Sequence, residues 1–121
     1  MKQIEIINKT KPLALPLTAR YCDGYWCKFK GLSFQKELPG NESLLMAEER
    51  DGKVNTSIHM LWMNFDLGIV WINNDGRVVD KAYAKKWVSF LAPKSPARYT
   101  LEILPDRLAE FEIGDEIVFK D

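Results

Sequence analysis

The sequence of 121 residues has only one histidine and two cysteines, and this shortage excludes several kinds of site. His59, Cys22 and Cys27 lack the second cysteine or histidine pair that a zinc site would need. The central region, residues 60–79, holds no phosphate-binding loop and no activated nucleophile. We therefore expect no metal, no cofactor and no catalytic residue. We also expect both cysteines to be reduced, with Cys27 as a small core residue.

An excess of one charge is also absent, because the 17 basic and 17 acidic residues cancel. Nonspecific binding to DNA or RNA depends on a long-range positive field, so nucleic acid is not an expected partner. No segment approaches the roughly 20 apolar residues of a membrane-spanning helix. The first residues alternate in character instead of opening an apolar signal sequence. We expect no membrane partner and a cytoplasmic location, and the sequence leaves the oligomeric state open.

The composition that is present is that of an ordinary globular protein. Hydrophobic residues make up 46% of the chain and charged residues 28%. A chain of this length can bury a core without a metal or disulfide scaffold. We expect one domain over residues 1–121.

Alternating and β-branched segments predict a protein made mainly of short strands. Residues 2–8 are expected at a sheet edge, and Pro12 and Pro16 are expected to keep the next strand away from central positions. The turns Asn74-Asp75-Gly76 and Gly114-Asp115 have a mechanical explanation, because glycine adopts positive φ without steric cost. The expected strands are 2–8, 13–20, 43–48, 57–64, 68–73, 77–86, 98–104 and 116–119.

Two short helices complete the prediction. Asp23 can cap a helix over residues 24–32, whose apolar stripe of Trp26 and Phe29 would plug one end of the sheet. A second helix opens at Pro105 and turns Leu108, Ala109 and Phe111 inward. The fold class is therefore α+β, mainly antiparallel β, with a small barrel-like curled sheet and two short helices.

Three runs in the middle of the chain carry a family resemblance: Leu61-Trp62-Met63-Asn64-Phe65, the apolar strand 69–72, and Asp75-Gly76-Arg77-Val78-Val79. With Lys30-Gly31-Leu32 before them and Gly114-Asp115 after them, they resemble domain-of-unknown-function family 192 over about residues 19–119. The resemblance implies a small bacterial or archaeal protein whose relatives often look exported and whose activity is not established. Where the family commonly has Pro and Asp, this chain has Asp66 and Gly68.

Aromatic and sulfur-containing residues concentrate in the same region. Trp62, Met63, Phe65 and Trp71 could line a pocket for an apolar or planar ligand, or they could form core. If 57–64 is a strand, alternation sends Trp62 and Phe65 to opposite faces, so at least one aromatic lies near solvent or a groove. The candidate ligand-binding residues are His59, Trp62, Asn64, Phe65, Asp66 and Trp71.

Basic residues gather after the central turn, with only Asp80 to offset them, and form a candidate patch for an anion or an acidic partner. Solvated lysines on an exposed strand are the alternative explanation. The residues concerned are Lys81, Lys85, Lys86, Lys94 and Arg98.

These features favour a non-enzymatic module that binds a small molecule or a peptide through an aromatic groove. The alternative is a hydrolase-like enzyme with His59 as base and Asp66 or Asp75 as the orienting or metal-binding carboxylate. A third hypothesis is a purely structural subunit of an assembly.

Overall fold

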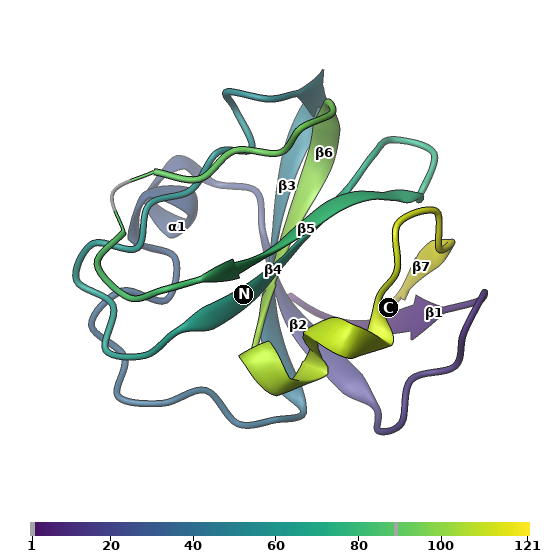
Figure 1. Cartoon of the computed structure of the whole chain (residues 1–121), viewed down its shortest axis with the longest axis horizontal. Coiled ribbons are helices and arrows are strands. Elements are labelled where there is room, and N and C mark those ends of the chain that lie inside the picture. Colours follow the sequence, from purple (N-terminus) through teal and green to yellow (C-terminus); the bar gives the residue numbers. More distant parts are fainter. Residues whose placement is uncertain (1, 89) are drawn as a thin grey trace.

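Seven strands form one curled sheet in the computed structural model, which describes residues 2–88 and 90–121 (Figure 1). Two short helices accompany the sheet: α1 (Tyr25–Lys30) and the 3₁₀ helix η1 (Pro105–Glu110). The strands are β1 (Gln3–Asn8), β2 (Leu17–Cys22), β3 (Glu42–Gly52), β4 (Leu67–Ile72), β5 (Val78–Ala84), β6 (Ala97–Ile103) and β7 (Ile117–Lys120).

The sheet has the order β5-β4-β6-β3-β2-β1-β7, and its pairs are antiparallel except for the parallel pair β2 and β3. Its two outer strands approach each other, because Arg77 and Glu116 form an isolated antiparallel bridge. Backbone bonds from Val78 N–H to the Asp115 carbonyl (2.9 Å) and from Ile117 N–H to the Gly76 carbonyl (2.7 Å) reinforce this closure. The α+β class and the mainly antiparallel curled sheet are confirmed.

Both faces of the central strands are buried. Every residue of β4 is buried, in keeping with its continuous apolar sequence. The core consists of two clusters of buried residues, and successive residues of a strand belong to different clusters. Leu45 and Val70 belong to the first cluster, and Leu44 and Ile69 belong to the second. The second cluster also contains Leu32, Ile58, Met60 and Met63 from the loops that cover that face. These loops carry the candidate site.

The strand expected over residues 57–64 does not form. Among the residues that the structure describes, Ile58 is the only one of this segment in a β-bridge, to Leu91, and the Met60 N–H instead donates to the Val88 carbonyl at 2.7 Å. Trp62 has φ of 65°, a left-handed conformation that no regular strand contains. The apolar content of this segment reflects its packing over the sheet and not a place in the ladder.

The N-terminal strands also lie elsewhere in the sheet than expected. β1 is an interior strand between β2 and β7, and β2 lies between β1 and β3. Pro12 and Pro16 precede β2 and do not interrupt its hydrogen bonds. The actual edges are β5 and the short β7.

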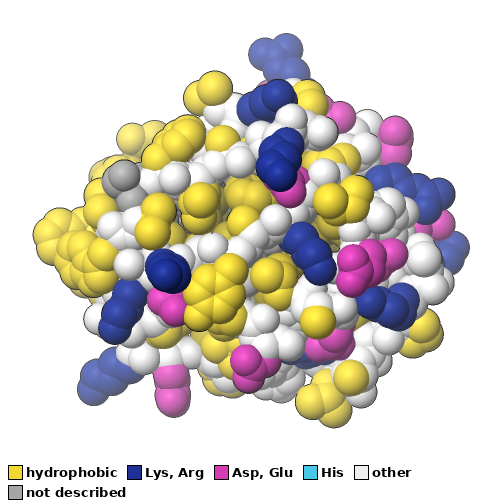
Figure 2. All heavy atoms as spheres, in the orientation of Figure 1, with side chains coloured by type: hydrophobic (Ala, Val, Ile, Leu, Met, Phe, Trp, Pro, Cys, Tyr) yellow, Lys and Arg dark blue, Asp and Glu magenta, His cyan; other side chains and the backbone are white. Residues whose placement is uncertain are grey.

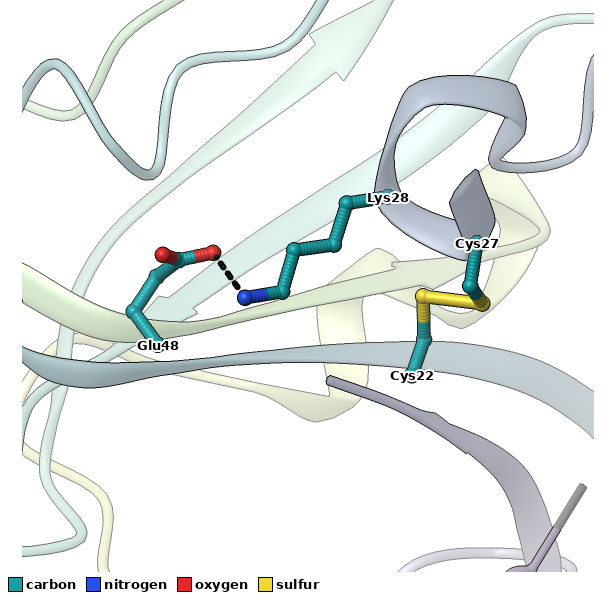
Figure 3. The surroundings of a disulfide bond; sticks show 4 residues. All are labelled: Cys22, Cys27, Lys28 and Glu48. Atoms are coloured by element: carbon teal, nitrogen blue, oxygen red, sulfur yellow. Dashed lines mark ion pairs between the residues drawn. A yellow bond between two sulfur atoms is a disulfide. The ribbon is translucent and has the colours of Figure 1, made fainter. Parts of the chain in front are cut away.

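Helix α1 does not plug the sheet. None of its residues is buried, Trp26 and Phe29 are exposed, and Gly24 occupies the N-cap in place of Asp23. A disulfide between Cys22 at the end of β2 and Cys27 in α1 attaches the helix to the sheet, with the Cα atoms 5.8 Å apart (Figure 3). The expectation of reduced cysteines was therefore wrong.

The second helix behaves more nearly as predicted. Pro105 opens η1, Phe111 at its C-cap is buried, and Leu108 packs against the first core cluster, whereas Ala109 is exposed. Gly76 and Gly114 have φ of 83° and 96°, as their turns require. No helix in the described part of the chain is long and apolar enough to cross a membrane.

Candidate functional site

Six large aromatic side chains are exposed to solvent on segments that adjoin one another. We call them the aromatic face. Between 52% and 76% of the surface of each is accessible, although rings of this size usually contribute to a core. Figure 2 shows hydrophobic side chains gathered at the left of the molecule, where Figure 1 places α1 and the neighbouring loops. The members are Tyr25, Trp26, Phe29, Phe34, Trp62 and Trp87.

Backbone hydrogen bonds hold these segments side by side. The Phe34 N–H donates to the Trp62 carbonyl at 3.0 Å, and the Trp87 N–H donates to the Met60 carbonyl at 2.7 Å. The Ser33 hydroxyl adds a bond to the Leu61 carbonyl at 3.3 Å. The loop around Trp62 is thus held between the segment after α1 and the segment after β5.

The exposed rings contact one another. Trp62 stacks on Phe34 with ring centroids 5.8 Å apart and meets Trp87 edge-on at 5.1 Å. Phe29 stacks on Tyr25 at 6.4 Å and lies 6.5 Å from the His59 ring. Such pairs contribute about 0.5–1.5 kcal/mol each when they are formed in a core. Here they order rings that remain open to solvent.

Three members of the face have a strained backbone. Phe34, Trp62 and Trp87 have φ of 68°, 65° and 70°, and no other non-glycine residue of the described chain has positive φ. This conformation is uncommon for bulky residues and costs on the order of 1–3 kcal/mol per residue. All three residues with this strained backbone are aromatic, and each exposes its ring to solvent.

The residues expected to bind ligand are only partly brought together. Trp62 is exposed, Asn64 donates to the Gln35 carbonyl at 2.7 Å, and Phe65 is half-buried against the second core cluster. Trp71 is core: it is buried, and its indole N–H donates to the Thr56 carbonyl at 2.8 Å. Of the two alternatives for Trp71, the lining of a pocket or the core, its burial supports the core.

The carboxylate of Asp66 accepts the Tyr83 hydroxyl at 2.6 Å and the Lys86 N–H at 2.8 Å. The Tyr83 bond, followed by the Lys86 bond, holds the pKa of Asp66 below its usual value. His59 is exposed beside the Phe29 ring, and among the described residues it makes no hydrogen bond to Asp66 or Asp75. The structure does not assemble the acid–base pair of the hydrolase hypothesis.

The predicted basic patch divides between different parts of the fold. The Lys81 ammonium donates to the Phe111 carbonyl at 2.8 Å, toward η1. Arg98 donates to the Glu48 carbonyl and to Asn74 Oδ1, each at 2.7 Å. Lys85, Lys86 and Lys94 are exposed. Lys81 and Arg98 are thus engaged within the fold and not directed to a common anion site.

A small pocket lies beside the aromatic face, between the end of α1, the loop around His59 and the sheet. We call it the Glu102 pocket. Its volume is about 110 Å³, well below the roughly 300–1,000 Å³ of sites for drug-sized ligands. Phe29 and His59 contribute to its wall together with Met46, Met60 and Met63, which with Met1 are all the methionines in the chain.

Glu102 is the residue of this pocket that sequence reasoning missed. It lies on β6 opposite Leu44 of β3 and Ile69 of β4, only 4% exposed. Burial raises the pKa of its carboxyl to about 7, and the charge of Arg20 offsets this only in part. The signal in the sequence was a glutamate in the apolar run Leu101 to Leu104.

The family model DUF192, described as an uncharacterised ACR, matches residues 6–119. The chain belongs to this family. The UPF0127 protein of Thermococcus kodakarensis is 35% identical over 114 residues, which cover 93% of this chain and 71% of that protein. The UPF0127 protein of Pyrococcus furiosus is 30% identical over 115 residues, covering 93% of this chain and 95% of that one.

Crystal structures of two other proteins show the same fold at lower sequence identity. A protein of unknown function from Novosphingobium aromaticivorans superimposes with a TM-score of 0.81 at 20% identity, over 96% of this chain and 83% of that one. A Sinorhizobium meliloti protein, whose name proposes transcription regulation, superimposes with a TM-score of 0.83 at 16% identity, over 97% and 92%. At these identities the likeness shows the fold alone.

Proposed function

We propose that this DUF192 protein is a non-enzymatic binding module that docks an extended peptide segment on its aromatic face. The observation that carries the proposal is the conformation of Phe34, Trp62 and Trp87, which have positive φ and expose their rings. Backbone strain of this kind persists where the surrounding structure imposes it, and it occurs preferentially at ligand-binding surfaces. A partner that covers the rings removes apolar surface from water and offsets that strain.

The open shape of the face favours a peptide over an enclosed small molecule. The adjacent Glu102 pocket is too small to enclose a drug-sized ligand. The exposed aromatic face suits an extended chain, because rigid aromatic rings supply a large contact area and lose little conformational entropy themselves on binding. No observation gives similar support to the hydrolase alternative, in which His59 would need a carboxylate partner.

The test is selection of displayed random peptides on the wild-type protein, followed by titration of the selected peptides with tryptophan fluorescence as the readout. We expect Trp62→Ala to weaken binding by about 30-fold or more, since tryptophans that a partner covers at the centre of an interface are typical hot spots. The matched control is Leu15→Ala, which truncates another exposed apolar side chain outside the face. Circular dichroism verifies that each variant is folded. A folded Trp62→Ala protein with undiminished binding would refute the proposal.

A further inference from the structure

The Glu102 pocket, beside the aromatic face, holds a buried carboxyl that the proposed function does not use. We infer that this pocket receives a cationic nitrogen group, an ammonium or a guanidinium, which forms an ion pair with the Glu102 carboxylate. The peptide of the proposed function would supply this group as a lysine or arginine side chain. Only this last step, the identity of the carrier, rests on the proposed function.

The carboxyl of Glu102 has no hydrogen-bond donor among the residues that the structure describes, although the residue is only 4% exposed. In the described chain, every side-chain oxygen that solvent cannot reach has a hydrogen-bond partner. Because the Glu102 oxygens have none, they must be accessible from the pocket that Glu102 lines. An unpaired carboxyl in an apolar sheet needs an explanation, because its burial is unfavourable. A bound donor supplies one.

The approach to this carboxyl is kept open by Gly31 at the end of α1. A Cβ atom at this position would lie 3.8 Å from Glu102 Oε1, so a larger side chain would extend over the carboxyl. The φ of 53° at Gly31 also favours glycine there. The end of α1 therefore borders the carboxyl without covering it.

No charged group in the described part of the chain forms an ion pair with Glu102. Lys28 of α1 is already paired with Glu48 of β3 at 2.8 Å (Figure 3). Arg20 of β2 favours the charged form of Glu102 from a distance, but burial outweighs its effect. Lys30 and His59 are the other titratable groups of the lining, and both are exposed. The carboxylate repels anions, and an apolar ligand would leave it unpaired.

The size and walls of the pocket fit the end of a cationic side chain. A volume of about 110 Å³ accommodates a small head group. Phe29 adds an aromatic ring, a type of group that attracts cations, to the wall, and the thioethers of Met46, Met60 and Met63 provide polarisable apolar contacts for a methylene stem. Because the wall residue Phe29 also belongs to the aromatic face, one peptide could occupy both.

The experiment uses the intact protein, labelled with ¹³C at the methionine methyl groups, with n-butylammonium as the cationic probe and n-butanol as its neutral counterpart. We expect n-butylammonium to shift the methyl signals of Met46, Met60 and Met63 saturably, with at least tenfold higher affinity than n-butanol. Its affinity should rise about tenfold from pH 6 to pH 8, because the bound form needs the ionised carboxylate whose pKa is about 7. Equal affinity for the two probes would overturn the inference without any variant.

Variants separate this site from the proposed peptide surface. Glu102→Gln should reduce n-butylammonium affinity at least tenfold, whereas Glu42→Gln, at an exposed position of β3, should leave it unchanged. Trp62→Ala should retain n-butylammonium binding, since Trp62 does not line the pocket. Retained binding by a folded Glu102→Gln protein overturns the inference. If peptides dock through Trp62 while n-butylammonium fails to bind, the inference falls and the proposed function stands.

Discussion

At the residue scale, Glu102 makes the stability of the protein depend on pH. Its pKa is about 7 in the folded chain and 4.5 when the side chain is fully solvated, because burial disfavours the carboxylate. Below pH 4.5 both states hold the proton. As pH rises toward 7, the unfolded chain releases the proton first and the free energy of unfolding falls. Above the pKa of the folded chain this decrease in the free energy of unfolding is complete, and it amounts to up to about 3 kcal/mol.

Glu102→Gln should therefore remove this loss of stability. We expect the variant to gain stability relative to the wild type between pH 5 and pH 8, measured by urea denaturation at both pH values. Asp66, Glu110 and Asp115 have pKa values below their usual ones, so their contributions change only at lower pH. An identical pH dependence in both proteins would contradict the prediction.

Individual site residues were predictable to different degrees. Strand alternation predicted at least one of Trp62 and Phe65 near solvent, and Trp62 is exposed, but it lies in a loop with a left-handed backbone and not in a strand. Glu102 was missed because Thr100 and Glu102 alternate with apolar neighbours, a pattern that predicts a solvent-facing side of β6. The chain covers this side with a loop and the end of α1. That covering depends on tertiary contacts, which periodicity does not report.

At the element scale, the disulfide explains how a short helix with no buried residue stays attached to the sheet. A helix of this length is marginal by itself in water. Cleavage of the Cys22–Cys27 bond by a reductant should lower the free energy of unfolding by about 2 kcal/mol, since the bond closes a short loop in the unfolded chain.

The measurement is thermal unfolding of the wild type with and without a phosphine reductant. Cys27→Ser is the control: it should unfold at the lower temperature of the reduced wild type and show no response to the reductant. Two reactive thiols in the untreated wild-type protein would show that the bond is not formed and would contradict the prediction.

Most strands follow from their own sequences, whereas the segments that make the site do not. The apolar run of β4 and the Asn-Asp-Gly turn specify a hairpin locally. Residues 57–63 have strand-like composition, yet their backbone donors and acceptors are engaged mainly by loop residues such as Val88 and Trp87. Such partners lie far along the chain, so composition predicted burial there and not conformation.

At the scale of the whole molecule, Gly76 helps to close the curled sheet. A Cβ atom at Gly76 would lie 2.9 Å from the Ile117 carbonyl oxygen, and its φ of 83° disfavours any other residue. Gly76→Ala should lower the free energy of unfolding by about 1–3 kcal/mol. Gly24→Ala is the matched control, because a Cβ there meets nothing within 4 Å. Chemical denaturation of both variants checks the prediction, and equal losses would contradict it.

Among the strands of this sheet, β1 is synthesised first and β7 last, and the two pair with each other, Glu5 opposite Lys120 and Asn8 opposite Ile117 (Figure 1). During translation β1 therefore lacks one neighbour until β7 has left the ribosomal exit tunnel. Native closure of the sheet is consequently a late event in biosynthesis, and a nascent chain stalled before residue 117 would expose one edge of β1 to chaperones or to other nascent chains.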